Sequence, residues 1–174
     1  MTGKSFLNGI ANDKIDILGC FLSILERLGA EYCVIGGLGV NAYVEPVVSL
    51  DLDIVIAVGG IEAVCREAQS VGLNIERFEH SVNLSSMDSD LRIQIQTDPR
   101  YQPFLSRSAS KEILGYTMQV ASLEDVFQGK LWAYLDENRR RSKRQKDLAD
   151  IMRLTETYPE LEQLLPPSVR RRLT

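Results

Sequence analysis

Apolar side chains recur every third or fourth position near the start of the chain, as they do in amphipathic helices. From Asn12, an expected N-cap, this spacing continues until Gly29 supplies a stop signal. The pattern predicts a helix of about four or five turns. Residues 1–11 before it are expected to form a loose lead-in. The apolar stripe of the predicted helix consists of Ile15, Leu18, Leu22, Leu25 and Leu28.

Short apolar runs bounded by turn residues predict the strands of a sheet. The runs Glu31–Gly36 and Asp51–Val58 are the most apolar, and Gly59-Gly60 ends the second. The segment Leu91–Gln96 alternates strictly, so its Leu and Ile side chains should face a core while Arg92, Gln94 and Gln96 face the other way. Further strands are predicted at Leu73–Phe78, Ser81–Ser85 and Tyr116–Val120.

Helical patterns separate these strands and dominate the C-terminal part. A short helix is expected over Val40–Tyr43 and a longer one over Ile61–Val71. Ser122-Leu-Glu-Asp125 resembles a capping box and predicts a helix to about Glu137. A basic run, Arg139–Lys146, leads into a last long helix that ends near Thr157.

The order of these elements predicts an α/β (α+β) fold in which helices flank a mixed sheet. Residues 1–121 should form the α/β core, and residues 122–174 a helical region packed on it within a single compact unit. A length of 174 residues is sufficient to bury a substantial core.

Composition narrows the function classes. A formal net charge of −4 gives no general attraction to nucleic acid or anionic membranes, so a polyanion must meet a local basic patch. The cysteines Cys20, Cys33 and Cys65 are scattered in apolar surroundings and are expected to be reduced core thiols. The sequence shows no signal-peptide pattern and no apolar run long enough to span a bilayer, so a cytoplasmic protein without membrane contact is expected.

The stretch Tyr32–Val58 combines a glycine turn with a pair of carboxylates. Gly36-Gly37 follows an apolar run, and glycines at a helix start let the backbone approach a phosphate closely. Asp51 and Asp53 open the next run, and alternate strand residues project from the same face. Two such carboxylates suit a divalent cation with hard oxygen ligands. The stretch therefore predicts a phosphate site beside a metal site.

Each half of this pattern has a simpler interpretation when taken alone. A glycine pair is more often a plain turn, and strand-start aspartates often face solvent. The segment GGLGVN lacks the dinucleotide-binding fingerprint and the Gly-Lys-Ser/Thr of a P-loop. His80 is the only histidine, which gives little support to a zinc site or a nucleophile–histidine pair. The combination of the two halves is what favours a nucleotide site.

At these residues the chain resembles the DNA polymerase beta-like nucleotidyltransferase superfamily, especially its small bacterial members related to abortive-infection and toxin–antitoxin proteins. Gly36-Gly37 and Asp51-Leu52-Asp53 carry the resemblance. The C-terminal segments Val120–Val126, Lys130 and Lys146-Asp147-Leu148-Ala149-Asp150 extend it. It spans roughly residues 12–157.

The resemblance implies roles for these residues. Asp51 and Asp53 would bind Mg²⁺ or Mn²⁺ and act in catalysis together with Lys130, while Asp147 and Asp150 would support the site. A nucleoside triphosphate would donate its nucleotidyl group to a protein or RNA acceptor and release pyrophosphate. The residues implied in nucleotide binding are Gly36, Gly37, Lys130 and Lys146.

The resemblance also has a gap at the third carboxylate of the superfamily. The best matching strand offers Gln94 at that position, with Asp90 and Asp98 outside it. With glutamine there, the usual general base for the acceptor hydroxyl would be missing. The alternative function is therefore a catalytically impaired nucleotide-binding or regulatory module of antitoxin type. A third hypothesis is RNA binding through the basic runs Arg139–Lys146 and Arg170–Arg172. The sequence leaves the nucleotide, the acceptor and the oligomeric state open.

Overall fold

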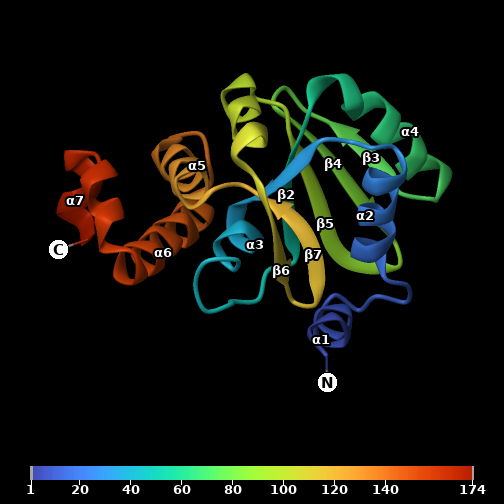
Figure 1. Cartoon of the computed structure of the whole chain (residues 1–174), viewed down its shortest axis with the longest axis horizontal. Helices are drawn as coiled ribbons and strands as arrows, with labels where there is room; N and C mark the ends of the chain where they lie inside the picture. Colours follow the sequence, from blue (N-terminus) through green and yellow to red (C-terminus); the bar gives the residue numbers. More distant parts are fainter. Residues whose placement is uncertain (1, 174) are drawn as a thin grey trace.

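A seven-stranded mixed sheet runs through the protein and separates two groups of helices (Figure 1). The computed structural model describes residues 2–173; Met1 and Thr174, the outer ends of the two predicted regions, lie outside the described residues. The strands are β1 (Tyr32–Ile35), β2 (Asp51–Ile56), β3 (Asn74–Arg77), β4 (Ser81–Ser86), β5 (Ser89–Gln96), β6 (Ala109–Ile113) and β7 (Tyr116–Val120). Their order across the sheet is β3-β4-β5-β2-β1-β7-β6. At its centre β2 runs antiparallel to β1 and parallel to β5, while β1 runs parallel to β7.

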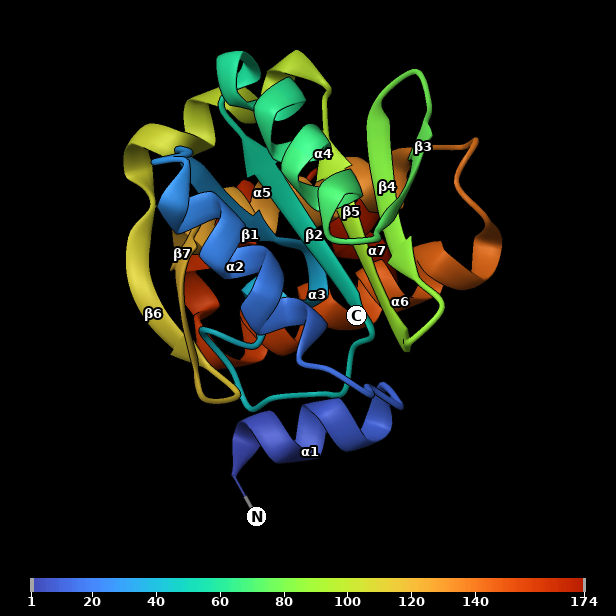
Figure 2. The same ribbon diagram turned by 90° about the vertical axis from the view of Figure 1, so that its right-hand side faces the viewer.

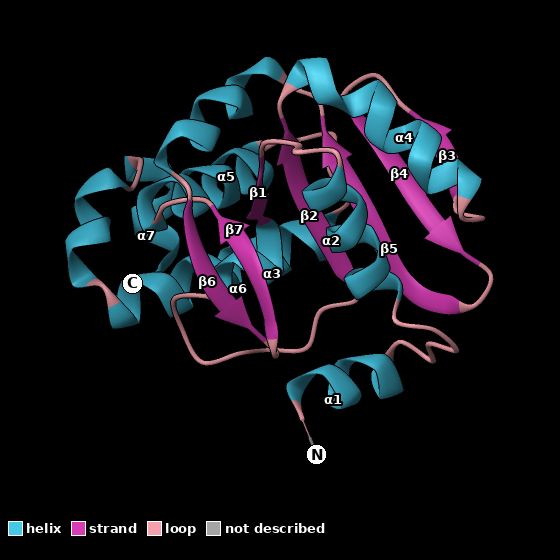
Figure 3. Cartoon of the chain, turned by 45° about the vertical axis from the view of Figure 1, so that its right-hand side comes forward, coloured by secondary structure: helices cyan, strands magenta, loops and turns pink. Residues whose placement is uncertain are grey.

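Helices cover both faces of the sheet. The α-helices are α1 (Gly3–Ile10), α2 (Ile17–Arg27), α3 (Gly36–Val40), α4 (Ile61–Ser70), α5 (Leu123–Leu135), α6 (Arg141–Thr157) and α7 (Pro167–Leu173). Short 3-10 segments are η1 (Val58–Gly60), η2 (Pro99–Arg107) and η3 (Pro159–Leu164). Figure 2 shows α2 and α4 in front of the sheet, with α5, α6 and α7 behind it. Coloured by element type in Figure 3, the molecule shows strands between two layers of helices. None of the described helices is long and apolar enough to cross a membrane.

Two hydrophobic clusters, one on each face, hold the layers together. On β2, Leu52, Ile54 and Ile56 belong to the cluster that includes α2 and α4, whereas Val55 belongs to the cluster shared with α5 and α6. This alternation confirms the predicted faces of the strand. It also directs Asp51 and Asp53, which alternate with the first set, toward the C-terminal helices.

The expected mixed sheet flanked by helices is confirmed, but the first residues of the chain differ from the prediction. Residues 3–10, expected as a loose lead-in, form α1, because Thr2 and Ser5 make a capping box and Leu7 is buried. The next helix does not begin at Asn12. Its N-cap is Asp16, whose carboxylate accepts a hydrogen bond from Gly19 N at 2.8 Å.

Other differences are local. The helix expected over Val40–Tyr43 instead begins at Gly36, so the glycine turn itself is helical. The edge strand β6 was not predicted, because its sequence ASKEI is polar and mostly exposed. Ser122 caps α5 as predicted, accepting from Asp125 N at 3.2 Å. Cys20 is only partly buried, so the expectation of a core thiol is wrong there.

Candidate functional site

The glycine turn at the end of β1 touches the second aspartate of β2. Gly36 has a φ of +65°, a conformation that side-chain-bearing residues rarely adopt. A Cβ at Gly36 would also overlap the carboxylate of Asp53. At Gly37 an added Cβ would lie 3.4 Å from Ser49 Oγ, an ordinary contact. The site therefore needs glycine at the first position of the pair and not at the second.

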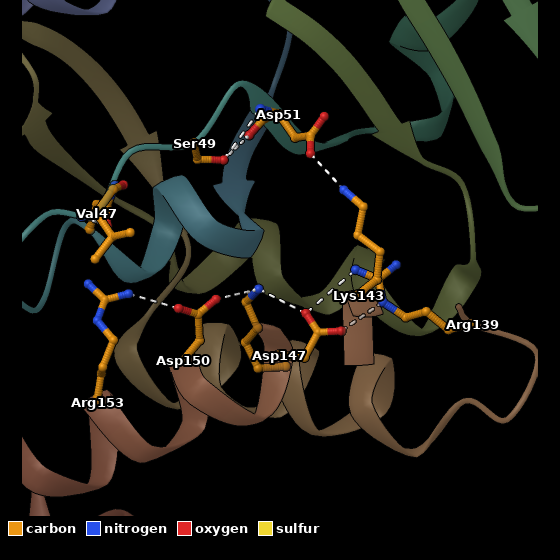
Figure 4. A network of polar contacts seen from close by, with 10 residues as sticks. Val47, Ser49, Asp51, Arg139, Lys143, Asp147, Asp150 and Arg153 are labelled. Carbon is orange, nitrogen blue, oxygen red and sulfur yellow. Dashed lines mark hydrogen bonds and ion pairs between the residues drawn. The ribbon is translucent and has the colours of Figure 1, made fainter. Parts of the chain in front are cut away.

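Asp51 and Asp53 project from one face of β2 and take different surroundings. Asp51 is held by two cations. Arg92 Nε of β5 is 3.1 Å from its Oδ1. Figure 4 shows the second contact, in which Lys143 Nζ of α6 is 2.9 Å from its Oδ2. Burial alone would raise the pKa of Asp51, but Lys143 and Arg92 outweigh it and lower that pKa below the ordinary value. Asp51 is thus an ionised carboxylate with bound counter-charges.

Asp53 lies deeper, and within residues 2–173 no cation pairs with it directly. Burial raises the pKa of Asp53, with the Lys130 charge opposing that rise and the Asp51 charge adding to it. In the parallel pairing of β2 and β5, Asp53 lies opposite Gln94. The predicted third position is therefore directly beside Asp53, and it carries an amide instead of a carboxylate.

A buried ion-pair network links the helices behind this strand. Lys130 Nζ of α5 is 3.0 Å from Asp147 Oδ1 and 2.7 Å from Asp150 Oδ2 of α6. Each carboxylate has a second cation, with Arg139 Nε 2.7 Å from Asp147 and Arg153 2.8 Å from Asp150 (Figure 4). Burial alone would lower the pKa of Lys130, but Asp150 and Asp147 raise it above the ordinary value. Both aspartates of α6 therefore contact Lys130 directly.

Some of these groups, namely Asp53, Lys130, Arg139 and Asp147, meet in one pocket between the sheet and the C-terminal helices. The cavity has a volume of about 60 Å³. Its lining includes Ile35, Gly36, Asp53, Gln94, Gln96, Tyr101, Gly129, Lys130, Ala133, Arg139 and Asp147. Lys146, implied in nucleotide binding by the resemblance, is exposed on α6 and does not line this cavity.

The two aspartates that flank the third position do not replace its missing carboxylate. Asp90 and Asp98 are each four residues from Gln94, a separation of about 13 Å along a strand. Asp90 accepts a hydrogen bond from the Asn12 side chain. Asp98 accepts hydrogen bonds from the backbone and side chain of Arg100, each at 3.0 Å. Both are therefore bound in local contacts away from Asp53.

The donor set fits a hard divalent cation. Among residues 2–173 no three acidic, histidine or cysteine side chains cluster as a ready metal cage. Asp51 and Asp53 nevertheless offer two carboxylates on one strand face, and Gln94 adds an amide oxygen opposite Asp53. A magnesium ion typically takes one or two protein carboxylates and completes its shell with water and substrate phosphates. A cation here would also compensate the burial that raises the pKa of Asp53.

Sequence reasoning did not single out three cations that shape the site. Lys143 and Arg139 lay inside the predicted basic run, but helical periodicity alone does not show which of its members turns inward. Arg92 was placed on the correct strand face, and the parallel register then brings it opposite Asp51. Tyr101 comes from the 3-10 segment η2, and burial raises the pKa of its hydroxyl to about 12, so the hydroxyl remains a donor at neutral pH.

With this geometry in place, comparison with known proteins is informative. Residues 40–172 match the family described as "Nucleotidyl transferase AbiEii toxin, Type IV TA system". The chain belongs to this AbiEii family. A search of curated protein sequences finds no significant match. The family assignment confirms the predicted nucleotidyltransferase and toxin–antitoxin relationship.

Solved structures agree with the AbiEii assignment at the level of fold. The antibiotic-resistance factor ANT(2'')-Ia shares 11% identity with a TM-score of 0.64, covering 89% of this chain and 90% of that one. The lincosamide antibiotic adenylyltransferase LnuA, solved with lincomycin bound, shares 16% identity with a TM-score of 0.59 over 84% and 99% of the two chains. A nucleotidyltransferase-like protein from Paracoccidioides brasiliensis shares 16% identity with a TM-score of 0.51, over 96% and 91%.

Proposed function

We propose that this AbiEii-family chain binds a nucleoside triphosphate with Mg²⁺ or Mn²⁺ and transfers its nucleotidyl group to a protein or RNA acceptor. The observation that carries the proposal is the meeting of Gly36, Asp53, Lys130 and Asp147 around one cavity. These residues come from a strand end, a neighbouring strand and two helices. Four residue types expected from a nucleotidyltransferase site therefore converge from separate parts of the chain.

Asp51 and Asp53 would hold the divalent cation, which neutralises charge on the phosphates during transfer. The backbone at Gly36 would lie against a phosphate oxygen, because no side chain separates that turn from the cavity. The acceptor oxygen would form a bond to the α-phosphorus while the bond to the β-phosphate oxygen breaks and pyrophosphate leaves. Gln94 would accept a hydrogen bond from an acceptor hydroxyl and orient it. Because an amide does not take up a proton, the hydroxyl proton would pass to water as the new bond forms.

Lys130 would act on this reaction mainly through position. Its ammonium is already shared by Asp147 and Asp150, so its charge fixes α6 against α5 and contributes a positive field at the cavity wall. Lys146 remains a predicted nucleotide contact from the resemblance, and its exposed place on α6 would suit only a part of the ligand outside the cavity.

The direct test replaces both metal-binding carboxylates. In the Asp51→Asn/Asp53→Asn variant we expect loss of Mg²⁺-dependent nucleotide binding and of label transfer from each of the four radiolabelled nucleoside triphosphates. Asp90→Asn is the matched control, since it changes a strand carboxylate outside the cavity. Circular dichroism checks that the variants fold. Label transfer at the unaltered rate by the double variant would refute the proposal.

A second candidate function follows from Gln94. A glutamine beside Asp53 cannot serve as a general base, which favours a nucleotide-binding regulatory module with little or no transfer. Gln94→Asp separates the two functions. Nucleotide binding without transfer by the natural chain, together with a gain of transfer in Gln94→Asp, would support the module. Transfer by the natural chain that Gln94→Asp leaves unchanged would support the enzyme.

A further inference from the structure

A second hollow lies on the other side of α6 from Asp51. It has a volume of about 290 Å³ and shares Arg139 with the catalytic cavity. Its lining combines the end of α5, the start of α6 and the C-terminal helix α7. The lining residues are Tyr134, Glu137, Arg139, Arg141, Arg144, Gln145 and Arg172.

Positive charge dominates this hollow. Four of its seven lining residues are arginines, and Glu137 is the one acidic member. Arg144 donates through Nε to Tyr134 O at 2.7 Å, which fixes its guanidinium at the rim. Arg139 is paired with Asp147, so the remaining positive charge of the wall comes from Arg144 and from Arg141 and Arg172, of which the last two are exposed. Among residues 2–173, Arg141 makes no ion pair.

The first turn of α6 divides the two cavities. Successive residues in an α-helix are about 100° apart, so Arg141, Arg144 and Gln145 share one side of the turn and Lys143 lies on another. Lys143 reaches Asp51 at 2.9 Å, while the other three residues line the hollow. A ligand in the hollow would thus lie across α6 from Asp51. Arg139 lines both the hollow and the first cavity, so it marks the side on which the two are adjacent.

The placement of these charges has a cost that a ligand would offset. The N-terminal end of a helix carries a partial positive charge, so the cations in the first turn of α6 are repelled by it. That turn contains no acidic residue to compensate them. Arginine also presents several donors in a planar fork that suits phosphate oxygens. A hollow that gathers arginines from the α5–α6 loop, α6 and α7 is chemically matched to a phosphate group.

We propose that the hollow binds a phosphate group of the acceptor, held by Arg141 and Arg172, while the reacting group of the acceptor lies at Asp53. Assigning this phosphate to the acceptor rests on the nucleotidyl transfer proposed above, whereas phosphate binding in the hollow does not. The phosphates of the nucleoside triphosphate would instead lie on the metal side of α6, beside Lys143. The acceptor is accordingly a phosphate-bearing molecule.

Titrations in Mg²⁺-free buffer test this assignment, with a ribodinucleotide that carries or lacks a terminal phosphate as the probe. We expect the terminal phosphate to tighten binding roughly tenfold or more, as charge-assisted hydrogen bonds do. Arg141→Gln/Arg172→Gln should abolish that advantage. Arg66→Gln/Arg171→Gln is the matched control, because it removes the same charge from exposed arginines outside the hollow. Glu137→Gln should tighten binding of the phosphorylated probe.

Two further measurements distinguish a failure of the phosphate site from a failure of the proposed transfer reaction. Binding of the phosphorylated probe should persist in Asp51→Asn/Asp53→Asn, even if transfer fails for other reasons. Binding of the Mg²⁺-nucleoside triphosphate should be unchanged in Arg141→Gln/Arg172→Gln. Equal binding of the two probes by the natural chain, or equal losses in the double variant and its control, would overturn the phosphate site. A loss confined to triphosphate binding would overturn its assignment to the acceptor.

Discussion

Replacing Lys130 with methionine would measure how strongly the buried ion-pair network fixes α6 against α5. Methionine keeps much of the length of lysine and removes only the ammonium. Removing one partner of a buried ion pair typically costs about 3–5 kcal/mol, because the other charge is left uncompensated. Here Asp147 and Asp150 each retain an arginine, so we expect the lower end of that range, about 3 kcal/mol.

The loss is measurable by urea denaturation and by thermal unfolding. For a domain of this size about 3 kcal/mol corresponds to a fall in Tm of about 6–12 °C. Arg153→Met is the control, since it leaves Asp150 paired with Lys130 and should cost at most about 1 kcal/mol. Equal stability losses in the two variants would refute the reasoning that burial makes Lys130 decisive.

The same network predicts a pH dependence with a definite sign. The carboxylates raise the pKa of Lys130 in the folded protein above its ordinary 10.5. A raised lysine pKa stabilises the fold fully below the unfolded value, and this contribution is lost as the pH rises through the folded value. The stability difference between the natural chain and Lys130→Met should therefore stay constant near neutral pH and shrink in strongly alkaline solution. A difference that shrank toward acid pH within the neutral range would contradict this account.

Three further outcomes are expected. Gly36→Ala should lower the free energy of unfolding by at least about 1–2 kcal/mol because of its positive φ, whereas Gly37→Ala should change it by less than about 0.5 kcal/mol in the same urea titration. Lys143→Ala should tighten Mn²⁺ binding about fivefold, because it removes from Asp51 a competing cation whose ion pair contributes about 1 kcal/mol. Electron paramagnetic resonance without nucleotide measures this affinity, and an unchanged value would count against the competition. Burial raises the pKa of Cys33 to about 12. Iodoacetamide should therefore leave this thiol unmodified in the folded protein at mildly alkaline pH and alkylate it after unfolding. Peptide mass spectrometry detects the alkylated cysteine.

Strong periodicity made the central part of the fold predictable. The alternation in Leu91–Gln96 fixes which face of this strand is buried, since a shift by one residue would turn every apolar side chain away from the core. The first helix and β6 were missed for the opposite reason. Gly3–Ile10 is only eight residues long, too short to show a repeating helical period, and it depends on its capping box, while β6 is an exposed edge strand without a clear apolar face.

The site was predictable as a set of residue types but not as a set of contacts. The spacing of Asp51 and Asp53 places both on one strand face whatever the rest of the chain does. The partners of Asp51 depend on the register between β2 and β5 and on how α6 rotates about its axis, neither of which is encoded locally. Arg92 and Lys143 therefore became recognisable only in the assembled structure.

The helix α6 contacts both Asp51 of β2 and Lys130 of α5, so its position controls both parts of the site. On α6, Lys143 reaches Asp51 of β2, while Asp147 and Asp150 anchor the lysine of α5. A displacement of α6 by one turn, about 5.4 Å, would withdraw all three side chains together. A protein that bound the exposed side of α6 and displaced it could therefore inhibit the site without entering the cavity or competing with nucleotide.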